Sequence, residues 1–333
     1  DSSSGLSKPL SSFFASLQDL AADPSSSATR QAALGQATAL ASRFTALQGQ
    51  LDQSDQEIDT RLRGAVNSLN ADSTALAKLN NTIAGQGQNP SADLLDQRDA
   101  LVQKMAALVG ISTVRQDDGS LNVFTSSGQP LVVGAKANAL GTASDIYRPS
   151  RTDITVGTAR ITNQLSGGSI GGLLDARRNV IDPASEQLGR IAVTLTSRIN
   201  AVQAQGVTAD GSAGTNVFTP ITAAALPAST NTGTASASVS FADLSVVTGE
   251  DYTLRYDGSQ WQMTGARSGQ SVTLSGNGSA ASPFTAAGLS IVVSGTPAAG
   301  DSLRISPTHS AASQVQLAAS DGSVFATAGA LSG

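Results

Sequence analysis

The sequence contains few side chains that could carry out catalysis, and their spacing matches no familiar catalytic centre. His309 is the single imidazole, so a nucleophilic serine would have to pair with it, and Ser310 is the nearest candidate. No acidic residue stands at a spacing that would orient this histidine, and no Gly-x-Ser-x-Gly motif is present. The absence of Cys excludes thiolate metal sites, disulfides and cysteine catalysis. We therefore expect His309 to be an exposed loop residue.

Three further groups of residues suggest ligand binding at first sight. The glycine-rich residues 167–172 precede a helical pattern, but they lack the Gly-Lys-Ser/Thr of a phosphate-binding loop, so they predict an entry into a helix. Asp117, Asp118 and Asp257 stand in turn sequences and lack the alternating acids of a calcium loop. The charged cluster at 93–99 is better explained by ion pairs at three- and four-residue spacing. We predict no catalytic, cofactor-binding or metal-binding residue, and hence no enzyme.

Aromatic side chains gather on one predicted hairpin. Tyr252, Tyr256 and Trp261 could stack on sugar rings, which would make this region a glycan-binding module. Alternating aromatic residues on strands more often belong to a core, and we favour that interpretation. The glycan-binding module on a helical stalk remains an alternative function of a different class.

A long helix is the element that the sequence predicts most clearly. No proline occurs between Pro24 and the end of the pattern near residue 84, and Asp23-Pro24 has the composition of a helix start. Apolar residues recur at about 3.6-residue spacing from Leu40 to Ile83, so the helix could reach ~90 Å. Asn89-Pro90-Ser91 opens a second helix that Gly110 closes, and residues 170–205 predict a third that restarts at Asp182-Pro183. Antiparallel packing of the three segments would give a narrow bundle.

Strand patterns fill two other regions. Alternation at 112–116, 121–125, 129–133, 153–156 and 159–162 predicts a small hairpin sheet that caps the bundle. Residues 211–242 contain no charge and predict a linker or a weakly specified strand. After them, 252–256, 261–264, 271–274, 289–293 and 301–305 predict a separate all-β domain.

The predicted fold class is therefore α+β and multidomain, with a long-helix, rod-like bundle, a small β-hairpin sheet and a separate all-β domain. We expect a helical rod domain at 1–210 with its β-hairpin segment at about 111–165, an outer all-β domain at 211–307 and a return segment or tail at 308–333. The 333 residues carry a net charge of −5, which gives no reason to expect nucleic acid or an anionic membrane as partner. No apolar stretch approaches the ~20 residues of a membrane helix.

Several blocks, in order, give the chain a likeness to a known family. Together they resemble the flagellar hook-associated protein 1 family, the hook–filament junction proteins. The blocks are FFASLQDLAA from Phe13, DLLDQRD from Asp93, LVGIST from Leu108, DDGSLNV from Asp117, SGQPLVVG from Ser127 and GSIGGLLD from Gly168 through Asp182-Pro183. The DLLDQRD block favours this family over flagellin or the second junction protein, which are the alternatives within the same class.

The resemblance implies a structural, extracellular part of the bacterial flagellum that is secreted by the flagellar export apparatus and forms a ring between hook and filament. The implied partners are identical subunits, the hook protein and the second hook-associated junction protein, with neither nucleic acid nor membrane insertion. Both chain ends should form a coiled-coil core in that family. We therefore expect this chain to be a fragment that lacks the terminal helices, the C-terminal one being where an export chaperone could act.

Overall fold

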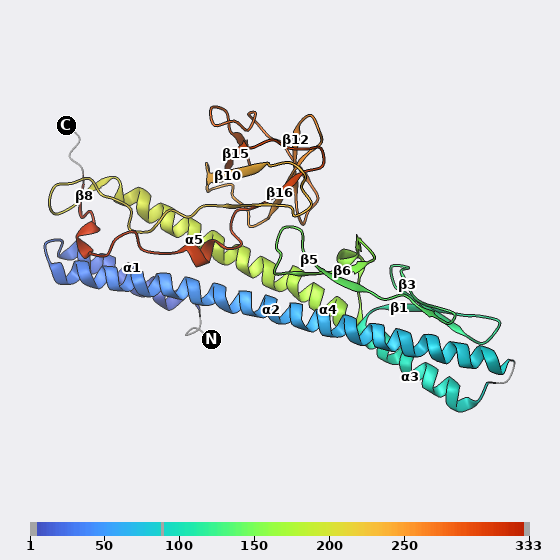
Figure 1. The fold of residues 1–333 in the computed structure, drawn as a ribbon. Helices are drawn as coiled ribbons and strands as arrows, with labels where there is room; N and C mark the ends of the chain where they lie inside the picture. Colours follow the sequence, from blue (N-terminus) through green and yellow to red (C-terminus); the bar gives the residue numbers. More distant parts are fainter. Residues whose placement is uncertain (1–4, 88–89, 330–333) are drawn as a thin grey trace. The chain divides into compact units, whose positions relative to one another are not determined.

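The computed structural model describes residues 5–87 and 90–329 and confirms a mixed α+β, multidomain fold. The chain divides into two compact units, which are Asp1–Asp52 with Asp182–Gly333, and Gln53–Ile181. Figure 1 shows the elements along the chain. The helices are α1 (Ser7–Ala22), α2 (Ser27–Gln86), α3 (Ala92–Leu108), α4 (Gly168–Ala176) and α5 (Asp182–Gln203), with a π-helical segment, Arg177–Ile181, between the last two.

The predicted long helix is present as α2, a helix of 60 residues, but its start was predicted wrongly. Asp23 and Pro24 lie in the turn after α1, and the backbone N–H of Asp23 bonds to the carbonyl of Asp19 at the end of that helix. The helix begins at Ser27 instead, because the Ser26 hydroxyl accepts the backbone N–H of Thr29. Helix α1 has no counterpart among the helices that periodicity predicted.

The second and third helices are confirmed with one qualification each. Helix α3 follows Ser91 as predicted, whereas Asn89 lies outside the described residues. The third predicted helix is divided into α4, the π-helical segment and α5, which begins at Asp182 as the proline predicted. Helices α4 and α5 contribute to different hydrophobic cores.

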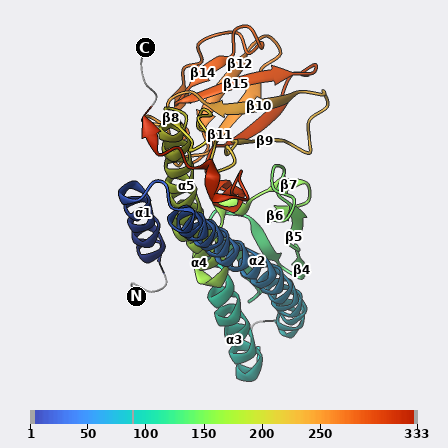
Figure 2. The ribbon, with the colours of Figure 1, turned by 90° about the vertical axis from the view of Figure 1, so that its left-hand side faces the viewer.

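The helical part of the first unit is built around α1, the beginning of α2 and α5, which Figure 2 shows alongside one another. Two returning segments complete this core, around Phe218 and around the 3-10 helices Ala311–Gln314 and Gly322–Val324. The rings of Phe13 and Phe218 meet edge-on with their centroids 6.1 Å apart. Strands β8 (Gly206–Val207) and β17 (Ala328–Gly329) pair at its end. Residues 311–325 thus pack against the helices of this unit.

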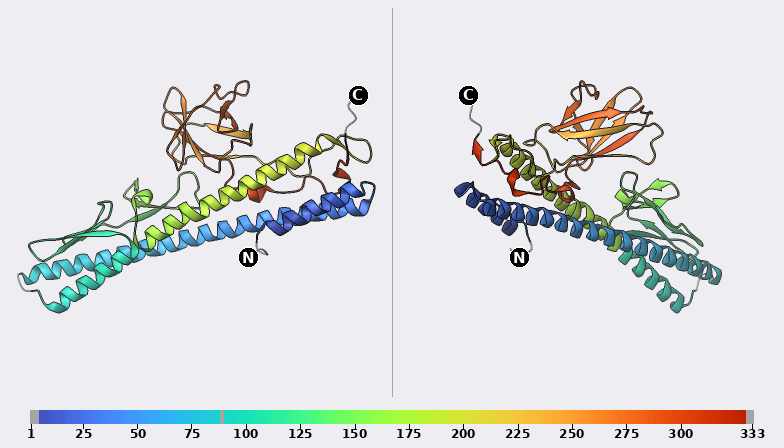
Figure 3. Two further views of the ribbon diagram at one scale, coloured as in Figure 1. Left: turned by 180° about the vertical axis from the view of Figure 1, so that it is seen from behind. Right: turned by 60° about the vertical axis from the view of Figure 1, so that its left-hand side comes forward.

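The same unit carries an all-β part with its own core, visible in Figure 3. One sheet has the order β13-β12-β11-β16-β9 and the other β10-β15-β14. Their bounds are β9 Ala224–Pro227, β10 Ser236–Phe241, β11 Tyr252–Tyr256, β12 Trp261–Gly265, β13 Ser271–Val272, β14 Phe284–Ala286, β15 Leu289–Ser294 and β16 Ser302–Ser306. The uncharged residues 211–242 therefore include two real strands, β9 and β10, and not only a linker.

The second unit packs two small sheets on helices. The strands β1 (Ile111–Arg115), β2 (Leu121–Thr125), β3 (Pro130–Val133) and β4 (Lys136–Ala137) form one sheet, and β5 (Gly141–Ser144), β6 (Thr152–Val156) and β7 (Ala159–Arg160) form the other. Their buried side chains share a core with α2, α3 and α4, as the predicted hairpin sheet required. Strands β4 and β5 have too little alternation to be predicted.

Three buried or half-buried asparagines fasten the connecting backbone to the helices. Asn80 of α2 is fully buried; its Nδ2 donates to the carbonyls of Leu121 and Gly134, and its Oδ1 accepts the N–H of Leu121. Asn70 makes the same paired contact with Leu140, at 2.8 Å each way. Asn200 of α5 holds the backbone of residues 217–218. In a chain with 4% aromatic residues, these amide contacts replace much of the packing that large side chains usually supply.

Candidate assembly surface

The structure places His309 in the turn between β16 and the 3-10 helix Ala311–Gln314, where it is half-buried. The expectation of an exposed loop residue is therefore wrong. The reason is a close backbone approach, because the preceding Thr308 is buried against Gly189 of α5. A Cβ on Gly189 would lie 1.7 Å from the Thr308 carbonyl oxygen, so only glycine fits there. This packing explains the histidine without a catalytic role.

The glycine-rich segment is an entry into α4, as predicted, and its glycines serve packing. Gly167 and Gly168 have φ values of 71° and 57°, in the left-handed region that favours glycine. A Cβ on Gly168 would lie 2.4 Å from the backbone of Leu108 and Val109 at the end of α3. The two glycines therefore let α3 and α4 meet closely.

The acidic residues of α3 form different pairs from those predicted. The buried Arg98 donates to its sequence neighbour Asp99 through Nε and Nη2, at 2.9 and 2.8 Å, rather than to a carboxylate three or four residues away. The four-residue contact on this helix joins Gln97 to Asp93. Because the aliphatic part of the Arg98 side chain is buried, its guanidinium can move little, and the adjacent carboxylate becomes its partner.

The predicted turn acids and hairpin aromatics also have structural explanations. Asp118 accepts the N–H of Ser120 in the β1–β2 turn, and Asp257 accepts those of residues 259 and 260 in the β11–β12 turn. These backbone hydrogen bonds lower the pKa of Asp257 to about 2. Tyr252 is buried, and the half-buried Tyr256 and Trp261 rings lie 5.3 Å apart. Within residues 5–87 and 90–329, no three His, Asp or Glu side chains are grouped as a metal site requires.

A buried ionic cluster in the second unit escaped the sequence analysis. Arg177 donates to Asp55 at 2.6 Å and reaches Asp59 at 2.8 Å, and Arg151 donates to Asp55 at 2.8 Å. Asp59 also accepts the backbone N–H of Thr152 at 2.7 Å. The partners are separated by about a hundred residues, so local spacing carries no sign of them. All four charges are compensated within the cluster, which marks it as structural.

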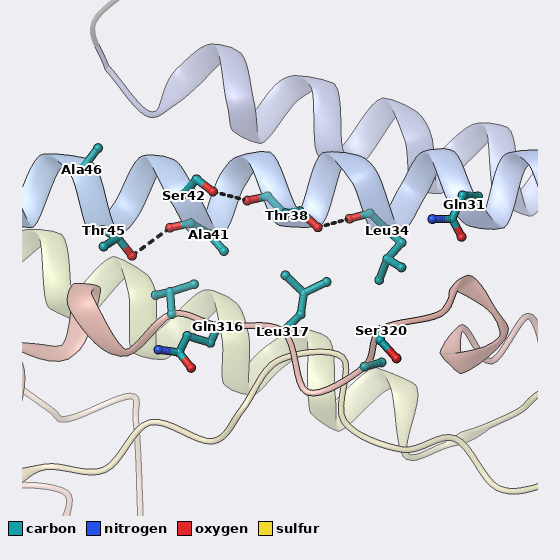
Figure 4. A pocket seen from close by; sticks show the side chains of 12 residues that line it. Gln31, Leu34, Thr38, Ala41, Ser42, Thr45, Ala46, Gln316, Leu317 and Ser320 are labelled. Atoms are coloured by element: carbon teal, nitrogen blue, oxygen red, sulfur yellow. Dashed lines mark hydrogen bonds between the residues drawn. The ribbon is translucent and has the colours of Figure 1, made fainter.

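An apolar groove runs along the N-terminal half of α2, beside the returning segment 315–320 (Figure 4). Its volume is about 750 Å³, and its walls include Leu34 and Ala41 from α2 and Leu317 and Ala319 from the other side. The hydroxyls of Thr38, Ser42 and Thr45 donate to carbonyls of their own helix, so they leave mainly carbon towards the groove. The groove can accept apolar side chains but offers no acid, base or nucleophile.

Helix α5 presents a second apolar feature. Ile191 and Val202 are 39% and 70% exposed. Eleven residues make about three helical turns, so both side chains lie on one face of α5. They lie about 16 Å apart along the helix axis, so they are two separate apolar positions on this face and not one contiguous patch. Among the described residues, no helix is long and apolar enough to cross a membrane.

Two family models match nearly the whole chain. The model "Flagellar hook-associated protein FlgK helical domain" matches residues 1–218. The model "Flagellar hook-associated protein 1, D2-like domain" matches residues 226–307. Their order along the chain agrees with the helical part and the following all-β part.

Individual proteins give the same result. The chain is 31% identical to flagellar hook-associated protein 1 of Escherichia coli strain K12, over 89% of this chain and 56% of that protein. It is 33% identical to the Salmonella typhimurium protein of the same name, over 79% of this chain and 50% of that protein. The solved structure of the flagellar hook junction protein FlgK from Burkholderia pseudomallei superposes with a TM-score of 0.88 at 35% identity, covering 97% of this chain and 60% of the other. The chain thus spans about half the length of the curated relatives.

Proposed function

The chain belongs to the flagellar hook-associated protein 1 family, and we propose that it serves in the bacterial flagellum as a structural part of the junction between hook and filament. The observation that carries this proposal is the likeness to the hook junction protein of Burkholderia pseudomallei over 97% of the chain. That likeness includes both the helical part and the all-β part, so it is not a match of one common domain.

We further propose that the protein is non-enzymatic, extracellular and secreted through the flagellar export apparatus. Packing and turn formation account for each candidate catalytic residue, which supports a mechanical role. For the domain organisation we propose a helical domain at 1–210, an outer β domain at 211–307 and a return segment at 308–333. The core shared by α1, α5 and residues 311–325 supports the return segment.

The proposed partners are identical subunits, the hook protein and the second hook-associated junction protein. The apolar face of α5 has the chemistry that such contacts need, because Ile191 and Val202 are large, apolar and exposed. A structural joint acts by making such contacts with each of its neighbours. Its mechanism is therefore geometric, and it depends on the fold of each subunit rather than on a reacting group.

Deletion of the gene tests the proposed function directly. Electron microscopy of the deletion strain should show hooks without filaments, with flagellin released into the medium, and the intact gene should restore filaments. Normal filaments in the deletion strain would contradict a junction role.

A substitution on α5 tests the proposed contact face. Val202→Asp in the complete protein should leave folding intact, because the side chain is 70% exposed, but it should reduce the number of filaments. Thr82→Asp, an exposed polar position on α2 and not on α5, is the matched control and should behave as wild type. Equal filament numbers for the two variants would show that Val202 is not part of the contact.

A further inference from the structure

The outer β domain, taken from the start of β9 to the end of β16 (residues 224–306), meets α5 at a buried carboxylate, Glu186. The side chain of Glu186 is 9% exposed, and it accepts a hydrogen bond from Nη2 of Arg267 in the loop after β12. A second loop of the same domain closes over it, since a Cβ on Gly249 would lie 3.1 Å from the Glu186 Cβ. These residues, with Glu250 and Ser268, line a cleft of about 280 Å³. A single helix side chain is therefore held between two loops of the outer β domain.

Several charged groups surround the Glu186–Arg267 pair. Arg267 is in contact with Glu186, whereas Asp182 and Asp251 add negative charge near Glu186, and Glu250 adds it near Arg267. Glu250 shapes the loop, because its Oε1 accepts the N–H groups of residues 267 and 268. Asp251 accepts the hydroxyl of the buried Ser306 at 2.7 Å.

Burial raises the pKa of Glu186 from 4.5 to about 7, and the attraction of Arg267 offsets this only in part. In a state where the outer β domain has moved off α5, Glu186 would meet water and recover its ordinary pKa. A carboxyl that binds its proton more tightly in the docked state stabilises docking fully below the ordinary pKa. That stabilisation is lost as the pH rises through the pKa of the docked state, about 7.

We propose that Glu186 is a proton-dependent latch, which holds the outer β domain on α5 more firmly in mildly acidic solution than in alkaline solution. The direction is opposite to that of an exposed salt bridge, which acid would break. Arg267 limits the loosening at high pH, because it compensates the carboxylate once the proton has left. This inference does not depend on the proposed function at the hook–filament junction.

The absence of Cys makes the latch directly measurable by site-specific spin labelling. Thr194→Cys on α5 and Ala280→Cys on the outer β domain are both exposed attachment sites. Double electron–electron resonance would record the distance distribution between the labels at about pH 5 and about pH 8.5 in the 333-residue chain. We expect a narrow distribution in acid and an added population of altered distances in alkali. The docking equilibrium should change on the order of 100-fold, since each pKa unit is a tenfold change.

Three variants separate the latch from other titrating groups. Glu186→Gln should give the narrow distribution at both pH values, because a neutral amide can still accept from Arg267. Ser268→Ala is the matched control in the same cleft; it changes no charge, so the variant should keep the wild-type pH dependence. Arg267→Met should broaden the distribution in alkali and leave it unchanged in acid. His309 is retained in all of them, so its titration contributes equally.

Several results would overturn the proposal. A wild-type distribution that is the same at both pH values excludes a latch that moves the domain. A distribution that broadens in acid would indicate an ordinary salt bridge. If the distance distribution of Glu186→Gln still changed with pH, the effect would belong to another group. Far-ultraviolet circular dichroism of each variant confirms that helix content is unchanged, so misfolding is recognised separately.

Discussion

Replacing Asn80 by Ala should destabilise the second unit more than its small size suggests. The Asn80 side chain is fully buried on α2 and makes three hydrogen bonds to backbone, at 2.9, 2.9 and 3.0 Å. The variant removes the partner of both backbone groups of Leu121 and of the Gly134 carbonyl. Leu121 lies in the buried strand β2, whereas Gly134 is partly exposed and can bond to water.

The expected cost follows from those three groups. A buried polar group left without a partner costs about 1–3 kcal/mol, whereas one that water reaches costs little. The two groups of Leu121 therefore dominate, and we expect a loss of about 2–5 kcal/mol, since Ala recovers less than 1 kcal/mol through its higher helix propensity. Asn80→Asp should be worse above neutral pH than at about pH 5, because an ionised carboxylate would face two carbonyl oxygens.

Urea unfolding and hydrogen exchange of the 333-residue chain would measure the effect. Exchange should accelerate most in peptides from residues 111–137, which contain the backbone that Asn80 holds. Asn81→Ala is the matched control, because Asn81 is the next residue on the same helix and is also an asparagine, but its side chain is exposed. A free energy of unfolding for Asn80→Ala within about 0.5 kcal/mol of that control would refute the reasoning.

Four further substitutions have defined outcomes. Arg177→Met should cost about 3–5 kcal/mol in urea unfolding, because it removes the cation that pairs with the buried Asp59, whereas Asp55 keeps its contact with Arg151. Gly168→Ala should lower the thermal midpoint through about 1–3 kcal/mol of backbone strain. The nearby Gly172→Ala, in open space on the same helix, should raise the midpoint slightly. Asp257→Asn should increase hydrogen exchange of the β11–β12 hairpin at neutral pH. The difference from wild type should shrink as the pH falls from 3.8 towards about 2, where the wild-type carboxyl takes up its proton.

Local patterns in the sequence were sufficient for the main helices and most strands. The 3.6-residue spacing from Leu40 to Ile83 predicts α2 because a helix buries one stripe of its surface. The turn residues of the β1–β2 and β11–β12 hairpins work in the same local way. Asp23-Pro24 misled the prediction of the start of α2, because an acid followed by proline suits a turn as well as a helix start. The hydroxyl of Ser26, a few residues later, supplied the cap.

The sequence could not predict contacts between residues that are distant in the chain. Arg177 meets Asp55 after 122 residues, and Arg267 meets Glu186 after 81 residues. Each of these residues taken alone resembles an ordinary surface charge, and only the fold brings the partners together and buries Arg177 and Glu186. His309 was mispredicted for the same reason, since its burial follows from the approach of Thr308 to Gly189. The groove beside α2 likewise depends on a segment that returns some 270 residues later.

The asparagines that hold connecting segments to the helices have a consequence for tolerated sequence change. Asn70, Asn80 and Asn200 contact only main-chain atoms of their partners, so the identity of the partner's side chain does not enter the interaction. The segments they hold can therefore exchange residues freely at outward positions while the asparagines stay fixed. A saturation-mutagenesis library of this chain should consequently show intolerant amides on the helices, facing segments that tolerate change at exposed positions but not at buried ones such as Leu121 and Phe218.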